Sequence, residues 1–205
     1  MVFTAHPCQK EKDGSETSTP VLWPLEIDPH AMRLAFHLAA HTLHVSRGKI
    51  AVHGHGCHST DDAAGGNATS IDGTGGSGIF SDGELTIKSA AIGTAKGGNA
   101  DNGTGGSGIR GDGSSDDFKL SIDSANITNA TGGSGWSGGH GIFGTAMKII
   151  SSAIRAIGGR STGEGDYTGG AGIVGSESLT IEGRTTVQAT GGNADNGTGG
   201  SGIFS

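Results

Sequence analysis

Two aromatic residues, Trp136 and Tyr167, occupy equivalent positions in consecutive glycine-rich segments of the chain. Each stands six residues before an isoleucine, at a position where the other glycine-rich segments carry glycine. Neighbouring aromatic rings on an exposed face can stack against a flat ligand such as a sugar ring, and they can also stabilise each other. We therefore expect a ligand-binding platform, with mutual stabilisation of the rings as the alternative. The residues expected to take part are Trp136, Tyr167, Ser137, Thr168, Asp166 and His140.

Oxygen-bearing side chains recur one and two residues before these aromatic positions, and three more aspartates lie between Ile109 and Leu120. Carboxylate and amide oxygens in a glycine-rich turn are ligands of the kind that Ca²⁺ takes. The alternative is that Asp and Asn serve as turn formers, with amides that hydrogen-bond along a stack of repeats. The candidate metal ligands are Asp72, Asp101, Asn102, Asp112, Asp116, Asp117, Asp166, Asp195 and Asn196.

The repeats offer few residues for catalysis. His140 is their only histidine, and no Gly-x-Ser-x-Gly segment lies at a strand-to-helix turn, where a hydrolase would place its nucleophile. The polar residues between the paired apolar positions include one lysine and no carboxylate cluster; they are Thr86, Ser121, Lys148 and Thr180. We therefore expect a protein that is not an enzyme.

The elements that must position these residues follow from an internal repeat. The segment Gly97–Ile109 returns unchanged as Gly191–Ile203, and the closing isoleucines of all five copies are spaced 30, 33, 31 and 30 residues apart. A fixed period of this size indicates a repeat architecture in which stacked units share one core. Four apolar positions recur in register. They are Ile79, Ile109, Ile142, Ile173 and Ile203; Leu85, Leu120, Met147 and Leu179; Ile87, Ile122, Ile149 and Ile181; and Ile92, Ile127, Ile154 and Val187.

Alternating β-branched residues between glycine-rich breaks predict short strands rather than helices. We expect an all-β fold, a single-stranded parallel β-helix (β-solenoid) with about 31 residues per coil, as the isoleucine spacing indicates. A glycine-rich disordered or fibrous chain is the competing interpretation, but it leaves the recurring apolar positions unexplained. Collagen is excluded because glycine does not stand at every third position.

The chain divides into three predicted parts. Residues 1–27 are expected to be irregular. Asp28-Pro29 is a good helix start, and residues 28–41 are predicted to form a helix that caps the first coil. Residues 42–205 should form the parallel β-helix, which we expect to be truncated at the C-terminus because the sequence ends partway through a coil.

Composition narrows the possible partners. Thirteen basic and twenty acidic residues give a net charge of −7, which argues against nucleic acid and anionic membranes. No apolar run reaches the roughly 18 residues of a transmembrane helix, and no secretory signal is visible among the first thirty residues.

The motifs Gly-Gly-Ser-Gly-Ile, Leu-Thr-Ile and Ala-Thr-Gly-Gly resemble the repeats of bacterial extracellular glycine-rich β-helix proteins. These include adhesin-like surface proteins and calcium-associated carbohydrate-binding β-helices. The resemblance covers about residues 43–205. It implies an extracellular or cell-surface location and a binding or structural role.

The expected function is therefore that of a non-catalytic repeat segment of a surface or secreted protein, adhesin-like or a structural stalk. The alternative is a calcium-assisted carbohydrate-binding module, and a polysaccharide lyase or glycosidase is the third choice. The expected partners are a polysaccharide or host cell-surface glycan, or a second copy that associates end to end through the open C-terminal coil. Ca²⁺ is the one candidate cofactor.

Overall fold

A computed structural model describes residues 62–112 and 120–205 with their side chains. For the rest of the chain it describes the backbone of strands within residues 2–5, 8–10, 16–18, 21–24, 41–46, 49–54 and 61. The described residues are all β, with no helix among them. The predicted capping helix over residues 28–41 falls outside the described residues except at its last position, where His41 begins a strand.

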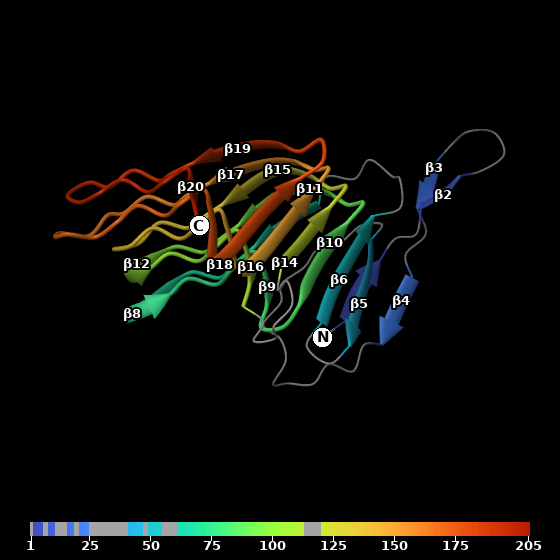
Figure 1. The fold of residues 1–205 in the computed structure, drawn as a ribbon. Helices are drawn as coiled ribbons and strands as arrows, with labels where there is room; N and C mark the ends of the chain where they lie inside the picture. Colours follow the sequence, from blue (N-terminus) through green and yellow to red (C-terminus); the bar gives the residue numbers. More distant parts are fainter. Residues whose placement is uncertain are drawn as a thin grey trace.

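Two sheets, parallel except at the first strand of the larger one, form the body of the solenoid, and the coils stack along it in sequence order (Figure 1). The nine-stranded sheet contains β5 (His41–Ser46), β6 (Lys49–Gly54), β9 (Ile79–Ser81), β10 (Leu85–Lys88), β13 (Ile109–Gly111), β14 (Leu120–Asp123), β16 (Ile142–Ile150), β18 (Ile173–Glu182) and β20 (Ile203–Phe204). The five-stranded sheet contains β7 (Asp61–Ala64), β11 (Ala91–Lys96), β15 (Asn126–Thr131), β17 (Ala153–Ile157) and β19 (Thr186–Thr190).

The register confirms the predicted parallel β-helix and all four apolar columns. Ile109 pairs with Ile79 and Ile142, and the Leu85, Ile87 and Ile92 columns align in the same way from coil to coil. Most of these side chains are fully buried, and each contributes about 1.5–3 kcal/mol through removal of apolar surface from water. In the last described coil the columns are open, and Ile181 and Ile203 are 42% and 47% exposed.

Side chains that face the interior become smaller along each coil. In β11 the buried positions pass from Ile92 to Ala95, and the chain continues into Gly97-Gly98. The alanine position forms a column of its own, which contains Ala63, Ala95, Ala130, Ala156 and Ala189. Because the inward-facing side chains become smaller, the outgoing and returning chains of each coil, its two walls, approach each other. The apolar core therefore ends where the glycines begin.

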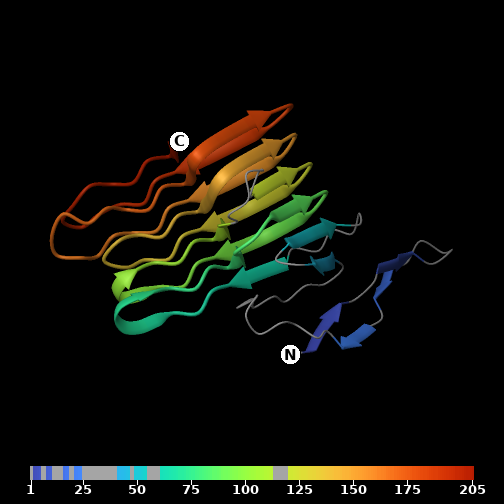
Figure 2. The same ribbon diagram turned by 60° about the horizontal axis from the view of Figure 1, so that its bottom comes forward.

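Beyond the core, each coil continues as a glycine arm, visible in Figure 2 as long double layers that carry few strand arrows. The outgoing chain of each arm contains a pair of glycines, at 65–66, 97–98, 132–133, 158–159 and 191–192. The returning chain contains another pair, at 75–76, 105–106, 138–139, 169–170 and 199–200. The two walls touch through backbone alone: a Cβ placed on Gly97 would lie 2.0 Å from the carbonyl oxygen of Gly106.

One backbone hydrogen-bond ladder crosses from wall to wall through the whole arm. Gly106 N donates to Gly98 O in the same coil, and Gly98 N donates to Gly76 O in the preceding coil, both at 2.8 Å. The second glycine of every pair repeats this pattern, with N···O distances of 2.7–2.9 Å. The ladder contains Gly66, Gly76, Gly98, Gly106, Gly133, Gly139, Gly159, Gly170, Gly192 and Gly200. The interior of the arm is therefore hydrogen-bonded peptide rather than packed side chains.

At the opposite end of each coil, a tight turn joins the two sheets. Ser89, Ser124 and Ser151 adopt positive φ values of 49°, 52° and 46°, and Gly183 takes the equivalent place with a φ of 69°. The left-handed conformation costs an L-residue roughly 1–2 kcal/mol, so these turns store local strain that the stacked coils hold in place.

Residues 1–27 were expected to be irregular, and this was wrong for the strands described there. β1 (Val2–Ala5) pairs antiparallel with β4 (Val21–Pro24), and β2 (Cys8–Lys10) pairs with β3 (Glu16–Ser18). Valine, phenylalanine and tryptophan in β1 and β4 are good strand formers that the prolines nearby obscured. The solenoid also begins differently from the prediction, because β5 pairs antiparallel with β6 and only β6 joins the parallel stack.

Candidate functional site

Each glycine arm ends in a short tip, the residues between its outgoing and returning glycine pairs. The five tips are 67–74, 99–104, 134–137, 160–168 and 193–198, with lengths of eight, six, four, nine and six residues. The first two tips contain β8 (Ala68–Thr74) and β12 (Ala100–Thr104), which pair in parallel. Trp136 lies in the shortest tip, and Tyr167 lies in the longest tip, on the adjacent coil.

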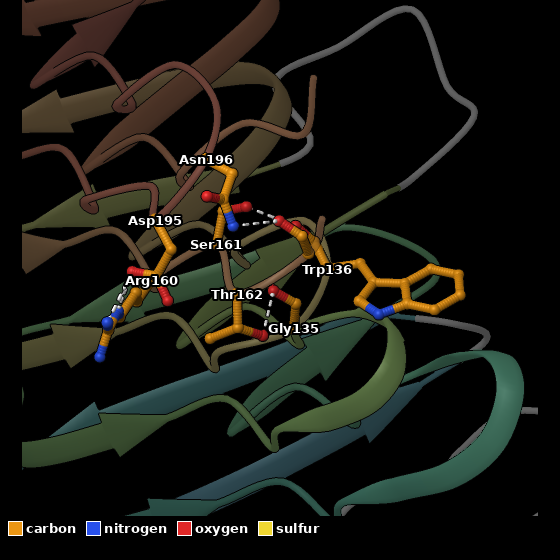
Figure 3. Close-up of polar contacts among 8 residues, drawn as sticks. Gly135, Trp136, Arg160, Ser161, Thr162, Asp195 and Asn196 are labelled. Atoms are coloured by element: carbon orange, nitrogen blue, oxygen red, sulfur yellow. Dashed lines mark hydrogen bonds and ion pairs between the residues drawn. The ribbon is translucent and has the colours of Figure 1, made fainter. Parts of the chain in front are cut away.

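The long tip folds across the short one and fixes its backbone (Figure 3). Thr162 donates to Gly135 O from its backbone N at 2.7 Å and from its hydroxyl at 3.1 Å. The buried Ser161 hydroxyl donates to the carbonyl oxygen of Trp136. The indole of Trp136 points away from these contacts in Figure 3. Hydrogen bonds to backbone carbonyls therefore hold the main chain at Trp136 in place, and the residue is half-buried.

Trp136 and Tyr167 do form the predicted aromatic pair. Their ring centroids lie 5.7 Å apart and their planes are tilted by 32°, so the rings touch each other and make no flat two-ring surface. Gly163 packs against both: a Cβ there would lie 2.4 Å from Tyr167 Cδ2 and 3.1 Å from Trp136 Cα. The loop therefore packs against Tyr167, and both aromatic residues are half-buried.

Ser137 and Thr168 lie where the sequence predicted, in a column that joins neighbouring tips. Ser137 bridges to Thr104, and Thr168 bridges to Thr198. The carbonyl oxygens of both residues accept from a glycine N–H in the preceding coil, at 2.9 Å for Ser137 and 3.0 Å for Thr168. Their carbonyl oxygens are therefore occupied by the stack.

Charge at the tips is predominantly negative. Arg160 is the only basic residue in the five tips, and it forms an ion pair with Asp195 at 2.6 Å from Nη2 to Oδ1. Four other carboxylates are exposed at the tips; they are Asp72, Asp101, Glu164 and Asp166. One cation against five anions gives the tips a formal charge of −4, more than half of the −7 of the whole chain.

His140 belongs to a separate cluster on the outer side of the nine-stranded sheet. Its ring stacks on Phe143 with centroids 5.7 Å apart, and Arg110 lies 5.2 Å from the Phe143 centroid. Three residues of chain separate His140 from Trp136. The prediction that His140 flanks the aromatic pair is therefore not supported by its contacts.

Burial, followed by the positive charge of Arg110, lowers the pKa of His140 below its usual value of 6.5. The hydrogen bonding agrees, because His140 Nδ1 accepts from the backbone N–H of Ala171 at 3.1 Å. An imidazole nitrogen that accepts a hydrogen bond carries no proton, so the neutral ring fits this position.

The candidate metal ligands do not converge where they are described. Asp112 pairs with Arg110 at 2.6 Å and Asp195 pairs with Arg160, so two of the carboxylates have cationic partners already. Asp116 and Asp117 lie outside the described residues. Across residues 62–112 and 120–205, no group of three or more His, Cys, Asp or Glu side chains is arranged to hold a metal ion. Calcium binding at Asp72, Asp101, Asn102, Asp166 or Asn196 stays a prediction.

The outward column on the nine-stranded sheet has the composition that the sequence indicated. Thr86, Ser121, Lys148 and Thr180 align in register. Lys148 forms an ion pair with Glu182 at 3.1 Å. The next outward column of the same sheet contains Lys88 and Asp123, which form an ion pair at 3.7 Å, so Lys88 and Lys148 both have carboxylate partners.

Sequence reasoning missed the residues that position Trp136. Ser161, Thr162 and Gly163 have no unusual composition, and their role follows from the difference in length between adjacent tips. The nine-residue tip is longer than the four-residue tip beside it, so its additional residues must pack against their surroundings. This difference in length can be read from the sequence.

Comparison with protein families, with curated proteins and with solved structures found no match. Within the part of the chain that the structure describes, no helix is long and apolar enough to cross a membrane.

Proposed function

We propose that this chain is a non-catalytic, adhesin-like repeat segment of a secreted or cell-surface protein, and that it binds a glycan through Trp136. The observation that carries the proposal is the tip geometry. Trp136 lies half-buried at the tip of an arm of hydrogen-bonded backbone, its indole points away from the polar contacts of the tip, and its ring centroid lies 5.7 Å from that of Tyr167. Stacking on an aromatic face is a common means of holding a sugar ring, and a fixed ring loses little conformational freedom on binding.

The charge of the tips favours uncharged glycans as ligands. Glu164 and Asp166 lie in the same tip as Tyr167 and are exposed, and the one cation, Arg160, is occupied by Asp195. A polysaccharide of uronic acids or sulfated sugars would meet this field with like charge, which is unfavourable at low ionic strength. Neutral glucans, mannans and galactans are therefore the first ligands to test.

The test is affinity electrophoresis of the purified chain through gels that contain neutral or uronic-acid polysaccharides. We expect at least one neutral polysaccharide to retard the wild type, and Trp136→Ala to abolish the retardation. Trp136→Phe should retain part of it, because a smaller aromatic face remains. Phe204→Ala is the matched control, since Phe204 is an aromatic residue of the last strand that is 59% exposed and lies outside the tips.

Two results would reject the proposal. One is that no polysaccharide retards the wild type. The other is that Trp136→Ala and Phe204→Ala reduce retardation equally, which would place binding elsewhere or make it non-specific. Cleavage of any polysaccharide in the panel, followed as new reducing ends or unsaturated uronides, would contradict the non-catalytic assignment.

A structural stalk is the second candidate, and the cross-wall glycine ladder favours it. A continuous run of backbone bonds through all five arms makes the molecule stiff without requiring any ligand. A stalk would show no glycan retardation, and the Trp136→Ala change would affect only the stability of the tip. The same gels therefore separate the two candidates.

A further inference from the structure

The identical segments Gly97–Ile109 and Gly191–Ile203 fold differently at their tips. In the first copy, Asn102 and Gly103 lie within strand β12, which pairs with β8. In the second copy, the equivalent Asn196 and Gly197 lie in a bend outside any strand. Asn102 is half-buried and Gly103 is buried, whereas Asn196 and Gly197 are both exposed. The same Asn-Gly dipeptide thus occurs once within a paired strand and once in a bend outside any strand.

We propose that Asn196 is a site of spontaneous deamidation, and that the fold protects Asn102 from the same reaction. In this reaction the backbone nitrogen of Gly197 loses its proton and attacks Cγ of Asn196. The Cγ–Nδ2 bond breaks, ammonia leaves, and a five-membered succinimide forms. Water then opens the ring at either carbonyl, which gives aspartate or isoaspartate. Water is the only co-reactant, and no enzyme or metal is required.

Backbone conformation makes Asn196 the reactive copy. The attacking nitrogen must reach the side-chain carbon, and the extended backbone of a strand holds the two apart, so Asn102 can react only after β12 opens locally. Asn196 and Gly197 lie in a bend, where no strand pairing has to break first. Gly197 adds no side chain to block the approach.

The protection of Asn102 can be bounded from its hydrogen bonds. Opening part of a strand breaks backbone bonds that are each worth about 0.5–1.5 kcal/mol. Loss of one or two such bonds corresponds to a decrease in the reactive population on the order of tenfold, since about 1.4 kcal/mol is a factor of ten. We therefore expect Asn196 to react roughly ten times faster than Asn102 in the folded protein.

Consequences for the tip follow from charge. Asn196 Nδ2 lies 3.5 Å from the carbonyl oxygen of Gly163, in the loop that supports Trp136 and Tyr167. Deamidation exchanges this amide for a carboxylate, which would face the carbonyl oxygen without a proton to donate. It also adds a sixth carboxylate to tips that carry five. An aged molecule would therefore differ from a fresh one at the candidate binding site itself.

The experiment uses the intact folded chain, incubated in mildly alkaline buffer and sampled over time. Trypsin separates the two copies, because Lys96 and Arg110 release residues 97–110, and Arg184 releases residues 185–205. Mass spectrometry with fragmentation then measures aspartate, isoaspartate and succinimide at each asparagine. We expect the products to accumulate at Asn196 roughly tenfold faster. The variant Asn196→Gln should remove the fast phase and leave the slow reaction at Asn102 unchanged.

Denatured chain is the internal control, since both copies have the same local sequence and should then react at similar rates. Equal rates at Asn196 and Asn102 in the folded protein would overturn the proposal, as would a faster reaction at Asn102. It would also be overturned if the denatured chain reacts at both sites while the folded protein stays unmodified at Asn196. The outcome does not depend on whether any glycan binds.

Discussion

At the scale of single residues, His140 links pH to stability. Its Nδ1 accepts a hydrogen bond from Ala171 N, and burial together with Arg110 lowers its pKa. In the unfolded chain His140 is protonated below about pH 6.5. In the folded chain its lowered pKa keeps the ring neutral to a lower pH, so acidification favours unfolding. The stability that this residue contributes is full above pH 6.5 and decreases as the pH falls toward the lowered folded-state pKa.

We therefore predict that His140→Asn reduces the acid sensitivity of the fold. Asparagine offers an acceptor oxygen near the position of Nδ1 but does not titrate in this range. Melting temperatures measured at neutral pH and at mildly acidic pH should differ more for the wild type than for the variant. The difference between the two proteins isolates His140 from the other histidines and carboxylates. An equal loss of melting temperature in both would show that His140 is protonated without cost in the fold.

Ser124 gives a second residue-scale prediction, because it adopts a φ of 52° in the turn between the sheets. Its side chain is exposed, so a substitution there tests the backbone rather than packing. Ser124→Asn should be close to neutral, since asparagine tolerates the left-handed region. Ser124→Val should destabilise the protein by about 1–2 kcal/mol, because a β-branched residue is strained there. Denaturant titration of the two variants measures the difference, and equal midpoints would contradict the assigned turn.

At the scale of elements, the glycine arm restricts the sequence most, because most of its glycines leave no room for a side chain. Gly133 and Gly66 occupy the same column in different coils. A Cβ on Gly133 would lie 2.0 Å from the carbonyl oxygen of Gly98, whereas a Cβ on Gly66 meets no atom of the described residues within 4 Å. We predict that Gly133→Ala destabilises the fold by about 1–3 kcal/mol or more, because backbone cannot move aside as a flexible side chain would.

Gly66→Ala is the matched control for this prediction, and it should change the free energy of unfolding by no more than about 0.5 kcal/mol. Chemical denaturation of both variants gives the comparison. If Gly133→Ala is tolerated as well as Gly66→Ala, neighbouring coils are not in backbone contact along this glycine column, and the close stacking of the arms would be wrong.

Much of this architecture could be predicted from the sequence. The Ile79, Leu85, Ile87 and Ile92 columns were predictable because burial selects apolar residues at a fixed period, and a period survives small changes in coil length. The glycine arm was not predicted, since glycine leaves no side-chain pattern that distinguishes a loop from two walls in contact. The alanine column that contains Ala95 was missed for a similar reason: alanine is common on surfaces as well as in cores.

The candidate site was predicted in part. The adjacency of Trp136 and Tyr167 followed from register, which the repeat determines. The tilt of the rings, the support from Gly163 and the separate placement of His140 depend on how an irregular nine-residue tip folds, and period alone contains no information about that. The pairing of Asp112 and Asp195 with arginines was also invisible, because Arg110 and Arg160 lie outside the columns that were compared.

At the scale of the whole molecule, the chain combines two kinds of interior. Isoleucine and leucine columns stabilise the body through the hydrophobic effect, whereas the arm is held by backbone hydrogen bonds between glycines. Coils of a solenoid contact mainly their neighbours, so the tips can vary in length and composition while the stack is maintained. This division allows identical and divergent tips to coexist in one chain.

The most direct test of the central claim is the fluorescence of Trp136 itself. The chain contains two tryptophans, so Trp23→Phe leaves Trp136 as the only indole reporter. We predict that titration of this variant with a neutral polysaccharide that retards the wild type will change the Trp136 emission in a saturable manner. Retardation of the variant without any change in Trp136 emission would contradict the claim that this ring is the binding surface.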